Sequence, residues 1–223
     1  MMTIRASAQT ILDPWKKSAW RHHGLGMLQA EFDYHHRVHI WHPDLRMAAV
    51  DEPFRDVHDH RFDLRSDIIT GEILDISYEV VTRPPPGSYD RAQRFAAGAL
   101  EAAGAWAFSK AWAIVNAKAQ ESRIAAGEPV VEKLCDVCVR ETGSRSFWAG
   151  QSYTIARRAF HTTRIAGLAV TCVTRSNFDT APARVLGEMP RFAITSRKNF
   201  DEVQPRVLEQ AHARLTELAG PNP

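Results

Sequence analysis

The sequence predicts a mainly β protein with one helical insertion and a C-terminal helix. Several separate segments are rich in β-branched and aromatic residues and are bounded by Pro, Gly or Asp, which is typical of strands. A long alanine-rich segment between them has the composition of a helix. Near the C-terminus, large side chains recur at helical spacing. Together these three observations favour a β domain with helical additions.

The composition fits a single domain over residues 1–223. Of the 223 residues, 44% are hydrophobic and 24% are charged, and one core can use this whole length. The 28 Lys and Arg residues exceed the 26 Asp and Glu residues by only two. Because no basic run accompanies this small excess, we expect no nucleic-acid partner.

The expected location is the cytoplasm. Residues 1–13 lack the apolar core and the cleavage site of a signal peptide. The most apolar window, 95–115, is about long enough for a membrane span, but it contains Glu101 and Lys110, so we expect no membrane association. Three cysteines cannot all pair within one chain, which favours a reducing compartment.

The first part of the chain predicts an extension followed by strands. Residues 1–30 are interpreted as an irregular or helical N-terminal extension. Phe32–Trp41 is predicted as a strand, and Pro43 ends it because proline cannot continue a central ladder. Residues 55–82 predict two or three further strands, with Gly71 at a hairpin turn.

The second part predicts a helical insertion, more strands and a final helix. Residues 84–126 begin with three prolines and then become alanine-rich, and their large side chains do not lie on one narrow stripe. Such a helix must be covered on more than one side, so a homodimer is one expected arrangement. A C-terminal helix is predicted over 200–219, with Pro205 near its start. The intervening strands are expected at 129–140, 146–158 and 167–175.

Two histidines two residues apart are the main functional signal. On a strand, His58 and His60 would point to the same side, and two imidazoles on one face can hold one metal ion. His161 lies just before an apolar strand and is a candidate third ligand. A ligating ring needs an acceptor at its second nitrogen, for which Asp59 and Asp63 are the nearby candidates.

The two segments around these histidines resemble the two motifs of the cupin superfamily. Residues 57–71 begin with the His-x-His pair and end at Gly71, as in the first motif. Gly150 is followed by His161, as in the second motif. The resemblance implies a cupin-type double-stranded β-helix (jelly-roll) barrel in which His58, His60 and His161 are the metal ligands.

This sequence differs from the cupin motifs at specific positions. The usual cupin glutamate falls at Leu64 or Arg65, so Asp63, one residue early, is the available fourth ligand. Three histidines without the glutamate are nearest to the cysteine dioxygenase branch. That branch has a Ser-x-His-x-Tyr pattern after the last ligand, and of the corresponding positions here only Thr171 is similar. The histidines lie farther apart in sequence than is typical of cupins, which the insertion explains.

The resemblance implies a metal-dependent enzyme that acts on a small molecule. A mononuclear non-haem iron oxygenase or dioxygenase is the first hypothesis. Fe(II) is the preferred divalent metal, and Mn, Ni or Zn are alternatives. A non-catalytic binding or assembly module is a second hypothesis, and a metal-independent isomerase is a third.

Other residues are candidates for the pocket or for alternative sites. Arg37 and His39 share one face of the predicted strand at 32–41, and with Tyr153 they are the candidate catalytic residues. His42 and Asp44 have the His-x-Asp spacing of a two-histidine-one-carboxylate iron site, with His161 as the distal ligand. Proline and Asp also favour a simple turn there. Cys135 and Cys138 have zinc-ligand spacing but lack a second pair, so they are interpreted as ordinary strand cysteines.

Overall fold

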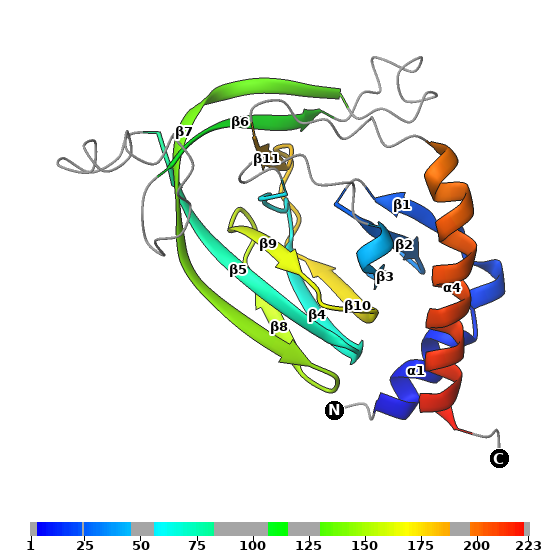
Figure 1. The fold of residues 1–223 in the computed structure, drawn as a ribbon. Helices are drawn as coiled ribbons and strands as arrows, with labels where there is room; N and C mark the ends of the chain where they lie inside the picture. Colours follow the sequence, from blue (N-terminus) through cyan, green and yellow to red (C-terminus); the bar gives the residue numbers. More distant parts are fainter. Residues whose placement is uncertain are drawn as a thin grey trace.

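The computed structural model describes residues 4–23, 25–45, 56–82, 107–115, 130–187 and 197–220. It is mainly β, with two antiparallel sheets and a long C-terminal helix (Figure 1). The elements, in chain order, are α1 (Ile4–Leu12), η1 (Trp15–Lys17), β1 (Arg21–His23), β2 (Met27–Glu31), β3 (His36–Trp41), η2 (Pro43–Leu45), β4 (Asp63–Thr70), β5 (Glu72–Val81), β6 (Ala107–Val115), β7 (Val130–Trp148), β8 (Ser152–Ile155), β9 (Phe160–Arg164), β10 (Ala169–Ser176), β11 (Arg184–Leu186) and α4 (Arg197–Ala219).

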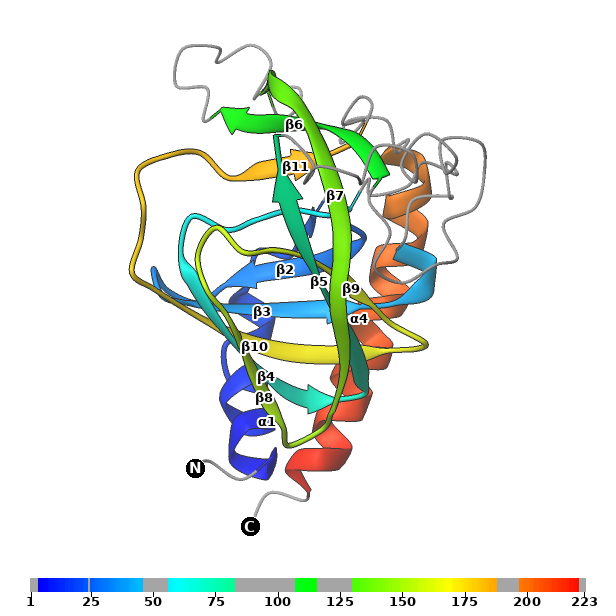
Figure 2. The same cartoon turned by 90° about the vertical axis from the view of Figure 1, so that its left-hand side faces the viewer.

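The strands divide into a six-stranded and a five-stranded sheet. The first has the order β1-β2-β3-β10-β4-β8, and the second has the order β11-β6-β7-β5-β9. The long strand β7 extends over most of the height of the molecule (Figure 2). The two sheets do not join into one closed barrel within the described residues. The prediction of a mainly β fold is therefore confirmed, and its finer part, a jelly-roll barrel, stays a prediction.

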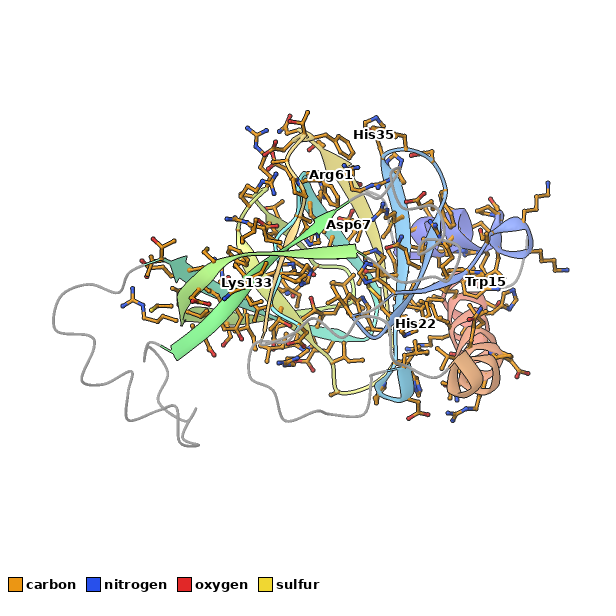
Figure 3. All side chains as sticks on the ribbon, turned by 90° about the horizontal axis from the view of Figure 1, so that it is seen from above. Trp15, His22, His35, Arg61, Asp67 and Lys133 are labelled. Atoms are coloured by element: carbon orange, nitrogen blue, oxygen red, sulfur yellow. The ribbon has the colours of Figure 1, made fainter. Side chains whose placement is uncertain are left out.

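The helices cover one face of the six-stranded sheet. α1 and α4 lie side by side over β1, β2 and β3 (Figure 1). On α4, Val207, Ala211 and Leu215 are fully buried at a spacing of four residues, which forms one apolar helix face. They pack with Val38 and Ile40 of β3 in the largest apolar cluster. Figure 3 shows Trp15, which also packs on this cluster, beside the helices and far from Lys133 on β7.

The C-terminal helix is longer than predicted. It begins at Arg197, so Pro205 lies inside the helix and not near its start. The predicted extension over 1–30 contains the helix α1, but it also contains β1 and β2, which the sequence did not indicate. β2 pairs along its full length with β3, and this tertiary pairing decides its conformation.

Gly71 occupies a bend between the two sheets and not a hairpin turn. It joins β4 of the six-stranded sheet to β5 of the five-stranded sheet, and these strands do not pair with each other. Its φ is +83°, and a Cβ atom there would lie 2.3 Å from the carbonyl oxygen of Leu168. Both the backbone conformation and the close approach therefore require glycine.

The predicted helical insertion is wrong over residues 107–115. These residues form β6, which pairs along its whole length with β7 and over residues 111–113 with β11. Helix propensity is a weak preference that tertiary context overrides, and the aromatic and β-branched residues of this segment fit a sheet. The remainder of the predicted insertion, 84–106 and 116–126, lies outside the described residues.

Candidate metal centre

Three histidines from distant parts of the sequence meet at one point of the fold. They are His58, His60 and His161, and one potential ligand atom from each lies within 4.8 Å of the others. The ring centroids of His58 and His60 lie 4.8 Å apart, and both rings lie close to His161. No other group of three His, Cys, Asp or Glu residues with this geometry occurs in the described part of the chain.

His58 lies between the two edge strands of the five-stranded sheet. It forms isolated bridges with His161 on β9 and with Val185 on β11. Its amide nitrogen donates to the carbonyl of His161 at 3.0 Å, and the amide of His161 donates back at 2.9 Å. The predicted placement of His58 and His60 on a strand is therefore wrong, because this segment is irregular. Tertiary bridging, and not strand alternation, brings the rings together.

Asp75 orients the ring of His161. The two residues come from neighbouring strands, because β5 pairs with β9. The Nδ1 atom of His161 lies 2.7 Å from Oδ1 of Asp75, and it donates because an ionised carboxylate can only accept. The Nε2 atom of His161 consequently has its lone pair free to ligate a metal, the arrangement found behind many metal-binding histidines.

A backbone carbonyl orients His58 in the same way. Its Nδ1 atom lies 2.9 Å from the carbonyl oxygen of Asp56 and donates to it. Burial lowers the pKa of both His58 and His60 well below the usual value, and the neighbouring imidazoles lower it further. Both rings are therefore neutral at pH 7, which is the form that binds a metal.

The closest approach within the cluster fits a shared ion. The Nε2 atoms of His60 and His161 are 3.0 Å apart. Two imidazole nitrogens that each bind one ion at about 2.1 Å come this close when they are adjacent ligands. The same distance also allows a direct hydrogen bond, with His60 donating to the lone pair of His161. The three imidazoles and the orientation of His58 and His161 therefore fit a metal.

The predicted carboxylate partners are not part of this cluster. Asp63 accepts hydrogen bonds from the amide of Arg157 at 2.7 Å and from the side chain of Asn177 at 2.6 Å. Leu64 lines the cavity, so Asp63 points to the opposite side of β4. Asp59 binds the backbone amide and the guanidinium of Arg184 at 2.6 and 2.7 Å. The prediction of Asp63 as a fourth ligand is therefore wrong. Neither Asp59 nor Asp63 accepts a hydrogen bond from a ring of the cluster, and Asp75 has this role instead.

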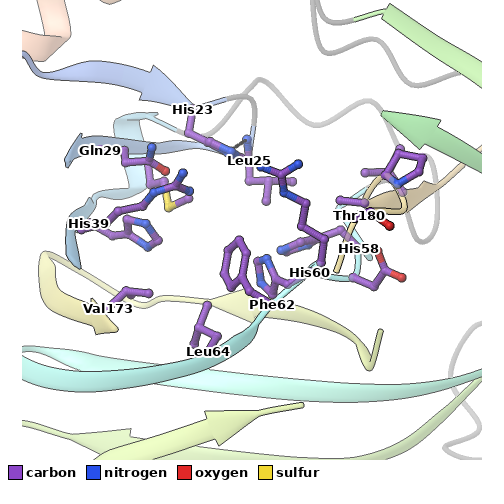
Figure 4. Close-up of a pocket in the computed structure, with 17 residues that line it drawn as sticks. His23, Leu25, Gln29, His39, His58, His60, Phe62, Leu64, Val173 and Thr180 are labelled. Atoms are coloured by element: carbon purple, nitrogen blue, oxygen red, sulfur yellow. Dashed lines mark hydrogen bonds between the residues drawn. The ribbon is translucent and has the colours of Figure 1, made fainter. Parts of the chain in front are cut away.

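A cavity of about 470 Å³ opens beside the histidines (Figure 4). His58 and His60 lie at one end, and Gln29 and His39 lie at the other. Arg37 and His39 both line it, so the structure places two of the three candidate catalytic residues at the cavity. The lining residues are His23, Leu25, Met27, Gln29, Arg37, His39, His58, Asp59, His60, Arg61, Phe62, Leu64, Val173, Thr180, Pro182, Ala183 and Val185.

Tyr153 is the candidate that the structure places elsewhere. It is not one of the described residues that line the cavity. Its ring stacks on that of Phe147, with the ring centroids 4.7 Å apart. Desolvation raises the pKa of its hydroxyl to about 12. Tyr153 lies opposite Ser66 in the pairing of β8 with β4 and packs in an apolar cluster with Phe147.

The alternative iron site does not assemble. His42 and Asp44 lie at η2, where the ring of His42 accepts a hydrogen bond from the amide of Asp44 at 3.2 Å. The carboxylate of Asp44 forms an ion pair with Arg206 on α4. His161 belongs to the other cluster. Cys135 and Cys138 are free cysteines on β7, as predicted.

Three residues of the site region were missed by the sequence analysis. Gln29 lies between Leu28 and Ala30, and Asp75 lies between Leu74 and Ile76. A polar residue flanked by apolar ones is the weak signal that could have drawn attention to them. His23 lies on the short strand β1, inside the segment interpreted as an extension. None of the three has a motif that would connect it to the His-x-His pair.

No protein-family model matches this chain, and no curated protein is significantly similar to it. None of the helices in the described residues is both long and apolar enough to cross a membrane. The geometry of the site is therefore the main basis for a functional proposal.

Proposed function

We propose that this protein is a cupin-type enzyme that holds one divalent metal ion through His58, His60 and His161 and oxidises a small molecule with dioxygen. The observation that carries the proposal is the convergence of three imidazoles, with His58 and His60 at one end of a cavity and with His58 and His161 each held by a hydrogen bond at Nδ1. Fe(II) is the preferred metal because three imidazole ligands leave coordination positions open, and Mn, Ni and Zn are the alternatives. When bound, the ion would supply a Lewis-acid or redox centre.

The protein's own residues have separate tasks in this proposal. Asp75 holds the proton of His161 on Nδ1 and so keeps Nε2 available as a ligand. Phe62 and Leu64 form an apolar wall of the cavity, which limits water next to the histidines. Arg37 and His39 both line the cavity, with His39 at the end distant from His58 and His60, and in this proposal they contact the substrate and not the metal.

Metal content measures the first step of the proposal. Untagged protein loaded anaerobically with Fe(II) should retain about one ion per chain after desalting. The double variant His58→Ala/His60→Ala should retain less than about a tenth of this, because one imidazole alone holds a metal weakly. His42→Ala is the control, because His42 lies outside the cluster, and it should bind like the wild type. Equal occupancy in all three proteins would contradict the proposal.

Substitution of Asp75 tests the orientation of the third ligand. Asp75→Asn keeps the size of the side chain but offers an amide in place of the carboxylate. Loss of a second-sphere partner of this kind typically reduces metal affinity by about 10- to 100-fold. Competition with a chromogenic chelator measures this effect. Asp63→Asn is the matched control, and an equal loss in the two variants would argue against a specific role of Asp75.

One observation favours a second candidate, a metal-independent isomerase. Asp75, His161 and His60 form a continuous chain of contacts at 2.7 and 3.0 Å, which is suitable for moving a proton. This candidate predicts activity that survives chelators. The burial of His58 beside the same chain is better explained by a metal, which is why the oxygenase is proposed first.

A further inference from the structure

The cavity end distant from the metal centre contains buried polar atoms without partners. The Oε1 atom of Gln29, the Nε atom of Arg37 and the Nε2 atom of His39 are buried and have no hydrogen-bond partner within the protein. Gln29 and His39 are each 7% exposed. Leaving such a group unsatisfied costs about 1–3 kcal/mol, so three of them in one place indicate a ligand that satisfies them.

These three residues share one face of two neighbouring strands. Gln29 on β2 and His39 on β3 are direct cross-strand partners, and Arg37 is two residues from His39 on the same face. Figure 4 shows Gln29 and His39 together, with His58 and His60 across the cavity. The three residues are called the polar subsite below.

Arg37, the charged member of the polar subsite, already has a carboxylate partner. The guanidinium of Arg37 lies 2.6 Å from Glu31. Arg175 lies 3.7 Å from the same carboxylate and is also attracted by that of Asp33. Arg21 reaches Glu31 from a side chain that is 64% exposed, where solvent screens its charge. Burial holds the pKa of His39 well below its usual value, so the ring is neutral.

We propose that the polar subsite binds an uncharged hydrogen-bonding group, a carboxamide or a hydroxyl, at the end of the substrate farthest from the metal. Such a group donates to Gln29 Oε1 and accepts from Arg37 Nε, whereas a carboxylate could only accept. Gln29 and His39 are then specificity-determining residues. The inference deepens the proposed function and relies on it for the position of the reactive end.

The test uses Co(II)-loaded protein and hydroxamic acids, which chelate a metal and change the visible spectrum of cobalt. Three probes of equal chain length end in a carboxamide, a carboxylate or an isopropyl group, with the length chosen as the one at which the carboxamide binds best. The carboxamide should bind at least about tenfold more tightly than either other probe, the effect of about one buried hydrogen bond. Tighter binding of the carboxylate, or equal binding of all three, would overturn the inference.

Two variants separate the polar subsite from the metal. In Gln29→Met the preference for the carboxamide should disappear, while acetohydroxamic acid, which reaches only the metal, binds as before. Trp20→Phe is the control, because Trp20 has a buried, unpartnered indole nitrogen but packs against the helix-side cluster and does not line the cavity. Its preference should stay unchanged, and a loss equal to that of Gln29→Met would contradict the assignment.

A metal-free measurement distinguishes the failure of this inference from the failure of the proposed function. If cobalt does not bind, the proposed function is wrong. Addition of butanamide to the metal-free protein should still shift the side-chain amide signal of Gln29 in a ¹⁵N–¹H spectrum, whereas butyrate should not. An unchanged signal with butanamide would show that the polar subsite takes no such group.

Discussion

The two faces of the β2–β3 hairpin differ in character: one is an apolar packing surface, and the other has polar atoms without hydrogen-bond partners. On β3, Val38 and Ile40 point to the helices and are completely buried in an apolar cluster. Arg37 and His39 alternate with them and point to the cavity, where each has an unpartnered polar atom. One strand therefore supplies an apolar core on one side and a polar cavity wall on the other.

This difference separates stability from function within a single strand. Burial of apolar surface on the helix side stabilises the fold, at about 25 cal/mol per Å². Buried polar atoms without partners on the cavity side cost free energy. Natural proteins keep such costs mainly where binding or catalysis requires them. Substitutions on the two faces should therefore have effects of opposite sign on stability.

The largest effect is expected on the helix side. Ile40→Ala removes a fully buried side chain from the cluster between β3 and the helices. We expect the free energy of unfolding to fall by about 2–5 kcal/mol, because both burial and packing are lost. Urea denaturation measures this loss. Under conditions where the variant remains folded, its metal content should equal that of the wild type, and a selective loss of metal would contradict the separation of the two faces.

An intermediate effect is expected from pH on the cavity side. Burial, followed by the positive charge of Arg37, lowers the pKa of His23 to about 4. As the pH falls below about 6.5, the unfolded chain binds this proton and the folded protein does not, so stability declines toward about pH 4. In His23→Gln, the slope of unfolding free energy against pH should be smaller by up to about 1.4 kcal/mol per unit, the value for one proton. Urea denaturation at several pH values checks it, and an unchanged slope would contradict a neutral His23 in the folded protein.

The smallest effect should have the opposite sign. Gln29→Met replaces a buried amide, whose oxygen is unpartnered, by an apolar side chain of similar size. We expect stability to rise by about 1 kcal/mol, because the cost of the unsatisfied acceptor is removed. Thermal unfolding measures the change, and Thr171→Val, which removes another buried, unpartnered oxygen, should raise stability in the same way. A clear loss of stability would show that Gln29 has a structural role and would weaken the contrast between the faces.

The three candidate ligands of the metal centre could be predicted from the sequence, but the residues around them could not. His58, His60 and His161 followed from residue type and motif spacing, and the structure brings them together. Asp75 could not be identified, because its contact with His161 depends on the pairing of β5 with β9. Asp63 was chosen for its closeness in sequence, but strand alternation turns it away from the site. Proximity along the chain is a poor guide when ligands come from separate strands.

The sequence by itself determined the mainly β class, the C-terminal helix, the three histidines and the alternation that separates Arg37 and His39 from Val38 and Ile40. These features depend on local composition and on a period of two, which need no partner to be recognised. Tertiary structure decided that residues 107–115 form a strand, that Gly71 joins two sheets, and that Asp75 and Gln29 belong to the site. Each of these depends on which strands pair, and pairing is set by contacts between residues far apart in the chain.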